Sequence, residues 1–201
     1  ISQRTATWLG GGFLGAGLVL FLLLQASPLM VFALGASILA YNAFHKKWKG
    51  AYWIMGACRL FLFLTPSSIP SQPSLELWFA GLLLLLFVAG ITLAARGEAS
   101  HQEVPGFAFT LLYAPCLSLL VVGNREYTLV AVLLLLLWIR GVHHFLQTGK
   151  LSVSGFVGCL LAGMVIVDAI SLSHLHPILP PLICLLFLPL NLFLQRFIPA
   201  T

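Results

Sequence analysis

The sequence predicts an all-α integral membrane protein, a polytopic bundle of transmembrane helices. Hydrophobic residues make up 60% of the 201 residues and charged residues only 7%, with a mean hydropathy of +1.05. A soluble domain carries about 25% charged residues. Backbone polar groups must be paired inside a bilayer, so only helices or a closed barrel span it. Apolar runs such as GLLLLLFVAGITLAA (81–95) lack the alternation of barrel strands and therefore favour helices.

The apolar segments predict about eight spans, each near the roughly 20 residues that cross a bilayer. The expected ranges are 7–26, 28–45, 50–65, 74–95, 104–122, 126–146, 152–172 and 177–198. Pro28 opens the second span, and the Pro/Ser-rich segment 65–74 ends the third. Pro180, Pro181 and Pro189 are expected to interrupt the last span. No internal repeat is evident, so residues 1–201 are expected to form a single transmembrane domain.

Positive charge alternates along the chain with its absence at almost every crossing. Three lysines follow the second span, Arg96 follows the fourth, and Arg140 and Lys150 mark the end of the sixth. The positive-inside rule then places these segments and both chain ends in the cytoplasm, as in a multi-pass protein of a bacterial cytoplasmic (inner) membrane. The net charge of +5 is explained by such loops and does not indicate a nucleic-acid partner.

The stretch YNAFHKKWKGAYWIMGACRLFLFL (41–64) holds the first candidate site. Lys46 and Lys47 are suited to phosphate contacts, and Tyr41 and Asn42 can add hydrogen bonds. The alternative is a topological role with attraction to anionic lipid head groups. The sequence leaves both interpretations open.

Two charges are expected inside the membrane. Arg59 lies about nine residues into the third span, where a charge usually faces a polar cavity or a partner. Asp168 is the only acid within a predicted span apart from Glu76 and Glu126 at span starts, and we expect it to hydrogen-bond across the bundle or to pair with a cation such as Arg59. A structural pair and a catalytic acid are both open, and the pair is favoured.

Other polar residues give weaker indications. Arg96 and Glu98 in the segment 94–103 suit a magnesium–phosphate site or an ordinary interfacial loop. Arg140, His143 and His144 share one helical face, which suits a metal or proton site or side chains that snorkel to the interface. The cysteines lie in apolar stretches without a CxxC pair and are expected to be buried small hydrophobes: Cys58, Cys116, Cys159 and Cys184.

The order of several stretches resembles the UbiA superfamily of intramembrane prenyltransferases, and within it the EboC-like branch. ISQRTATWLGGGFLGAGL (1–18) resembles the helix after the family's first aspartate-rich loop, and the stretch 41–64 resembles its Tyr…Lys loop with Gly-x-Cys-Arg. FVAGITLAARGEAS (87–100) resembles the second motif, VGCLLAGMVIVDA (157–169) a late helix, and RFIPAT (196–201) the C-terminus.

The resemblance implies a helical bundle around a central apolar cavity, with Mg²⁺ and cations holding a prenyl diphosphate. It implies that Lys46, Lys47, Arg59 and Arg96 contact the diphosphate and that Glu98 is a remnant metal ligand. The sequence departs from the family because no Asn-Asp-x-x-Asp loop is present and the second motif lacks aspartate. Two expectations follow from these departures. Either the chain is the C-terminal two-thirds of a longer domain whose preceding residues would supply the first motif, or it is a diverged relative that has lost the chemistry.

The expected function is that of a UbiA-like prenyltransferase homologue. It would bind a prenyl diphosphate or an isoprenoid lipid in the membrane and, with that first motif, transfer the prenyl group to an acceptor. The alternative is a non-catalytic membrane subunit of a larger complex that holds a lipid, a quinone or a pigment. A small transporter is the weakest hypothesis, because no inverted repeat with broken helices is evident.

Overall fold

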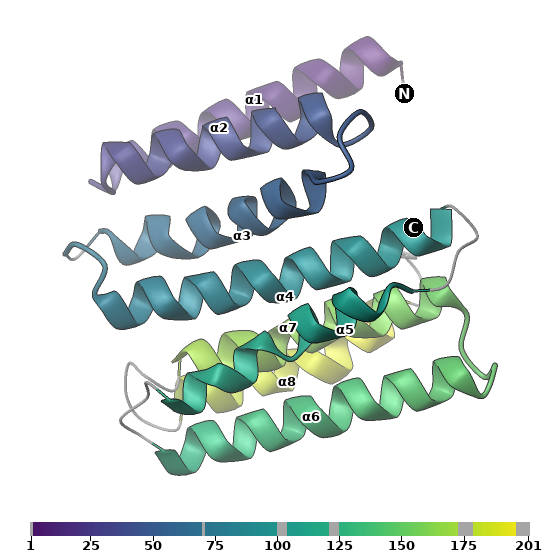
Figure 1. Ribbon diagram of the computed structural model, residues 1–201. Coiled ribbons are helices and arrows are strands. Elements are labelled where there is room, and N and C mark those ends of the chain that lie inside the picture. The colour runs from purple at the N-terminus through teal and green to yellow at the C-terminus, as the bar shows by residue number, and fades with distance from the viewer. Residues whose placement is uncertain (1, 70, 100–103, 121–124, 173–178, 196–201) are drawn as a thin grey trace.

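The computed structural model shows helices that run in alternating directions, so that the chain crosses the bundle repeatedly (Figure 1). It describes residues 2–69, 71–99, 104–120, 125–172 and 179–195. The connection 45–50, the connection 148–152 and the start of the first helix lie at one end of the bundle, which we call the lysine end (Figure 1).

The helical segments agree closely with the predicted spans, and the described part of the chain contains no strand. Their bounds are α1 Gln3–Leu23, α2 Pro28–Phe44, α3 Ala51–Ser67, α4 Leu75–Ala99, α5 Gly106–Leu112, the 3₁₀ helix η1 Ala114–Leu120, α6 Arg125–Gln147, α7 Val153–Leu172 and α8 Leu179–Leu194. Among the described residues, the α helices at 75–96, 126–147 and 153–172 are long and apolar enough to cross a membrane, and the apolar helical stretches 7–23, 28–44, 106–120 and 180–194 are shorter. These features indicate a helical membrane protein.

The predicted fifth span is not one continuous helix. α5 ends at Leu112, and η1 continues from Ala114 with tighter 3₁₀ turns. Pro115 explains the break, because proline has no N–H to donate and its ring clashes with the carbonyl four residues earlier. The predicted span 104–122 is thus helical over 106–120, with a change from α to 3₁₀ turns inside it.

The last predicted span shows the opposite difference. α8 continues from Leu179 to Leu194 without a break, although Pro189 lies inside it. Pro180 and Pro181 fall in its first turn, where the backbone N–H groups have no partner within the helix. The expectation that these prolines interrupt the last helix was therefore wrong.

The helices pack in the order of the chain at first and then around α4. α1 packs on α2, α2 on α3, and α3 on α4, while α4 also packs on α5, η1 and α7. α7 is flanked by α6 and α8. The main core lies between α4, α6 and α7, where large side chains are fully buried, namely Phe87, Leu135, Phe156 and Leu160.

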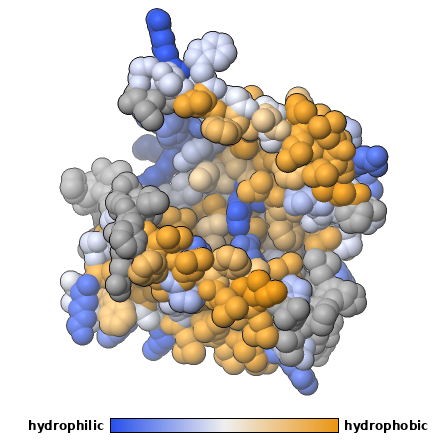
Figure 2. All heavy atoms as spheres, turned by 180° about the vertical axis from the view of Figure 1, so that it is seen from behind, coloured by the Kyte–Doolittle hydropathy of each residue, from blue (hydrophilic) through white to orange (hydrophobic). Residues whose placement is uncertain are grey.

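Much of the outer surface is apolar. Trp8 and Phe13 on α1 are 82% and 76% exposed, and the rear face of the molecule is largely hydrophobic (Figure 2). A hollow on that face shows hydrophilic atoms among hydrophobic ones (Figure 2). An exposed apolar surface of this extent is what a lipid environment requires and water does not favour.

Candidate functional site

The lysines between α2 and α3 lie on a compact loop, residues 45–50, which we call the lysine loop. Its first turn continues the end of α2, because the His45 N–H donates to the Tyr41 carbonyl (2.8 Å) and the Trp48 N–H to the Phe44 carbonyl (2.9 Å). The His45 ring stacks on Tyr41 with its centroid 5.4 Å away. Lys46, Lys47 and Lys49 are all exposed. The loop therefore has an ordered backbone that presents three ammonium groups outward.

Arg96, near the C-terminal end of α4, holds this loop from the side. Its Nη2 donates to the carbonyls of His45 (3.0 Å) and Trp48 (3.2 Å), and its Nη1 donates to the carbonyl of Lys49. The structure thus brings Arg96 to the lysine loop. This agrees with the prediction that both segments lie on the same side of the membrane. Its described hydrogen bonds go to backbone carbonyls, which gives it a structural role besides the predicted diphosphate contact.

Sequence reasoning missed the partners of Arg96, because backbone carbonyls carry no residue signature. The signal that indicates them is the end of α2, since the last carbonyls of a helix lack partners within it. A cation on α4, two helices further along the chain, meets that need only when α4 lies beside the loop. The contact therefore depends on tertiary packing.

We expect Arg96→Met to loosen the lysine loop without unfolding the bundle. Hydrogen bonds from a charged group contribute about 1.5–3 kcal/mol each in stability, and the loop loses all of those from Arg96. Amide hydrogen exchange at residues 45–50 should accelerate by about tenfold or more, which corresponds to about 1.4 kcal/mol. Arg140→Met, at an exposed arginine, is the matched control. Equal amide exchange rates at residues 45–50 in both variants would show that Arg96 does not stabilise the lysine loop.

Arg59 and Asp168 form an ion pair between α3 and α7. The Arg59 Nη2 lies 3.0 Å from Oδ2 and 3.4 Å from Oδ1 of Asp168, and the two side chains are 30% and 29% exposed. The Arg59 Nε is buried without a partner among the described residues. α3 and α7 both pack on α4, so the ion pair links two helices that share α4 as a neighbour. The predicted pairing of Asp168 with Arg59 is present.

The ion pair is separate from the lysine loop. Arg59 lies eight residues beyond the start of α3 at Ala51, or about 12 Å along the helix axis. Asn42 belongs to the last turn of α2, and its carbonyl lies 3.0 Å from the His45 Nδ1. Tyr41 is occupied by the stacking on His45. The candidates thus divide into an end group around the lysine loop and an ion pair deeper in the bundle.

The described residues do not fit a magnesium site. No group of three His, Cys, Asp or Glu lies together in the part of the chain that the structure describes. Glu76 and Glu126 begin α4 and α6 at the end opposite the lysine loop (Figure 1), and Asp168 is paired with Arg59. The Glu98 side chain lies outside the described part. No carboxylate is therefore described beside the lysine loop.

His143 and His144, for which a metal or proton site and snorkelling to the interface were both considered, lie near the end of α6. The His143 ring packs against the Phe109 ring of α5 at 4.3 Å between centroids. His144 and Arg140 are exposed. This arrangement explains His143 as a packing residue between α5 and α6.

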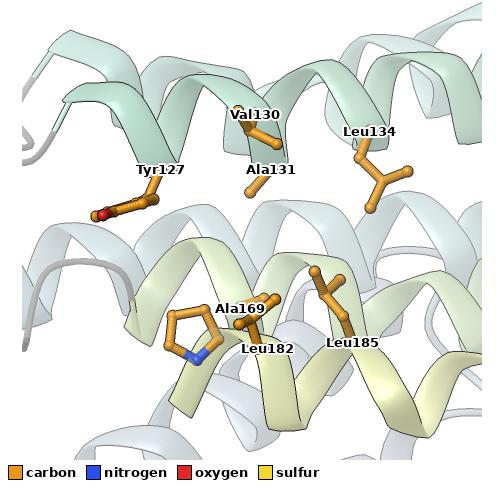
Figure 3. Close-up of a pocket in the computed structure, with 8 residues that line it drawn as sticks. Tyr127, Val130, Ala131, Leu134, Ala169, Leu182 and Leu185 are labelled. Atoms are coloured by element: carbon orange, nitrogen blue, oxygen red, sulfur yellow. The ribbon is translucent and has the colours of Figure 1, made fainter. Parts of the chain in front are cut away.

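An apolar cavity of about 220 Å³ lies between α6, α7 and α8 (Figure 3). Tyr127, Val130 and Leu134 come from α6, and Leu182 and Leu185 face them from α8 (Figure 3). An outer groove of about 660 Å³ follows α3 and α4 near Glu76. Both lie away from the lysine loop, and the central cavity implied by the family resemblance stays a prediction.

The site therefore consists of an exposed cationic loop, an arginine that holds it, and a separate intramembrane ion pair. The loop suits anions, and the ion pair suits bundle stability or a polar ligand. Comparison of the chain with protein-family models, curated proteins and solved structures found no match.

Proposed function

We propose that this protein is a UbiA-like homologue that binds an isoprenoid diphosphate or isoprenoid lipid from the side of the lysine loop. The observation that carries the proposal is the geometry of this loop. Lys46, Lys47 and Lys49 project from a backbone that Arg96 holds in place, at one end of an apolar helical bundle. A diphosphate needs several cations at the interface, while its tail needs hydrocarbon.

The topology proposed with this function has eight membrane crossings and both chain ends in the cytoplasm. The alternating helix directions support it, because the lysine loop and the connection 148–152 lie at the same end (Figure 1). These connections carry the positive charges that remain on the cytoplasmic side. The diphosphate would then be bound from the cytoplasm.

The proposal concerns binding rather than prenyl transfer. Cleavage of a prenyl diphosphate places charge on the departing diphosphate, which an enzyme must stabilise. The cations described at the loop are its lysines and Arg96, and no group of three His, Cys, Asp or Glu that could hold a metal lies in the described part of the chain. Lysine ammonium groups suffice to bind the anion as point charges.

The test is binding of farnesyl diphosphate to the protein in nanodiscs of zwitterionic phosphatidylcholine. Lys46→Ala with Lys47→Ala should weaken binding by roughly 100-fold or more, since each charged contact contributes about 1.5–3 kcal/mol. Isothermal titration calorimetry measures the affinity. Raising the salt concentration should weaken wild-type binding as well, because exposed charges are screened.

The control for that experiment removes the same number of charges elsewhere. Arg4→Ala with Arg140→Ala changes two exposed arginines outside the lysine loop. Wild-type affinity in this control would assign the loss to the loop. Unchanged affinity in the Lys46/Lys47 variant would refute the proposal.

A second function, a non-catalytic subunit of a membrane complex, is favoured by the exposure of α1. α1 packs mainly on α2 among the described elements, and an added Cβ at Gly10, Gly11, Gly12, Gly15 or Gly17 would meet no atom within 4 Å. Small residues on a membrane helix permit close approach of another helix. Absence of farnesyl diphosphate binding, together with a stoichiometric quinone or pigment in the purified protein, would favour this function.

A further inference from the structure

We propose that the groove between α6, α7 and α8 binds one acyl chain of an anionic phospholipid whose phosphate lies on Lys150. This lipid site is distinct from the lysine loop and does not depend on the function proposed for that loop. The groove has a volume of about 480 Å³, within the roughly 300–1,000 Å³ range of small-molecule sites.

The wall of the groove is apolar along its length. Its lining includes Leu137, Trp138, Phe145, Leu151 and Leu192. The indole Nε1 of Trp138 donates to the Cys159 carbonyl (3.0 Å), so the polar atom of this ring is already satisfied. The groove therefore offers hydrocarbon surface to a ligand.

Lys150 is the charged residue in this lining, and the backbone fixes where it stands. α6 ends in a turn in which Gly149 has φ of 68° and the Lys150 N–H donates to the Phe145 carbonyl (3.0 Å). The Gly149 N–H donates to the Leu146 carbonyl (3.1 Å), which completes a Schellman motif. Only glycine adopts this left-handed conformation without strain. The turn thus holds Lys150 at the lysine-end rim of an apolar groove.

The combination selects an anionic phospholipid. A single cation at the rim complements a phosphate, and a lysine near a membrane surface contributes about 1 kcal/mol to binding of anionic lipid. The rim lies at the same end as the lysine loop, where the bundle meets the interface (Figure 1). A free phosphate would leave the groove empty, whereas an acyl chain fills it.

Gly141 provides a way to close the groove. It lies in the lining, and a Cβ added there would meet no atom within 4 Å. Gly141→Leu should therefore place its side chain in the groove without a clash against the bundle. Gly15→Leu, at an equally open position on α1, is the matched control.

The experiment uses the full chain with Trp138 as the only tryptophan, obtained with Trp8→Phe, Trp48→Phe, Trp53→Phe and Trp78→Phe. The protein is placed in phosphatidylcholine nanodiscs that contain a fixed fraction of dibrominated phosphatidylglycerol or dibrominated phosphatidylcholine. Bromine quenches tryptophan only at close range. The apparent affinity for the anionic lipid should exceed that for the zwitterionic lipid by about fivefold, the equivalent of 1 kcal/mol.

Two variants test the acyl-chain contact and the head-group contact separately, each with a matched control. Gly141→Leu should abolish the quenching difference, whereas Gly15→Leu should retain it. Lys150→Gln should remove the roughly fivefold preference for the anionic lipid, while Arg4→Gln should preserve it. Native mass spectrometry of the chain with all its tryptophans provides an independent count of bound phosphatidylglycerol. It should decrease with Lys150→Gln and with Gly141→Leu.

Three results would overturn the proposal. Equal quenching by the two brominated lipids would show that the groove does not select an anionic head group. An unchanged preference in Lys150→Gln would remove the lysine from the site. Equal quenching in the Gly141→Leu and Gly15→Leu variants would show that the acyl chain lies elsewhere.

Discussion

Asp168→Ala is expected to lower the free energy of unfolding by about 3 kcal/mol. The substitution leaves the Arg59 guanidinium inside the bundle without its carboxylate, 3.0 Å away in the native protein. Breaking a buried ion pair on one side costs about 3–5 kcal/mol, and the partial exposure of both side chains places this pair at the low end. Unfolding in mixed micelles with increasing dodecyl sulfate measures the change.

The double variant Arg59→Met with Asp168→Leu distinguishes an unpaired charge from a general packing defect. Replacement of both charges with apolar side chains of similar size is often neutral or stabilising. The double variant should therefore be more stable than Asp168→Ala by at least about 1 kcal/mol. Glu76→Ala, at an exposed acid, controls for loss of negative charge and should change little. A double variant as unstable as Asp168→Ala would contradict the explanation.

Gly56→Val is expected to have an effect of similar size, about 3 kcal/mol or more. A Cβ at Gly56 would lie 2.5 Å from the Leu85 carbonyl oxygen and 3.0 Å from the Leu85 Cγ. The obstacle is backbone on a neighbouring helix, so α3 and α4 must separate to admit the side chain. Overpacking in a well-packed contact costs about 1–3 kcal/mol and occasionally more.

The same unfolding experiment tests this substitution. Gly15→Val, at a position where an added Cβ has open space, should change stability by less than about 1 kcal/mol. Equal stability of Gly56→Val and Gly15→Val would show that the close approach of α3 and α4 is not needed. Loss of the Arg96 contacts to the lysine loop in Gly56→Val would be a further consequence, because α4 carries Arg96 to that loop.

The helical class was predictable because composition decides it. A chain with so few charges must pair its backbone polar groups in helices or a closed barrel, and its apolar runs lack the alternation of barrel strands. The alternation of positive charge also placed the 45–50 and 148–152 segments at one end, where the structure has them (Figure 1). The pairing of Arg59 with Asp168 could be predicted from the sequence for a related reason. Mid-span charges of opposite sign are too costly to leave apart.

Several features depended on local backbone geometry instead. Pro115 coincides with a change to 3₁₀ turns, whereas α8 continues through Pro189. Both prolines remove a backbone donor, yet only at Pro115 does the helix change to 3₁₀ turns. A proline therefore changed the helix type in one predicted span and left the helix continuous in another.

The sequence by itself indicated a helical membrane protein with a cationic loop at one end and favoured a pairing of Arg59 with Asp168, because charge and hydropathy can be read residue by residue. Only the tertiary structure decided that Arg96 binds the carbonyls of that loop and that Lys150 stands at the rim of an apolar groove. Carbonyl partners and grooves arise from the placement of whole helices. No residue pattern along one segment encodes them.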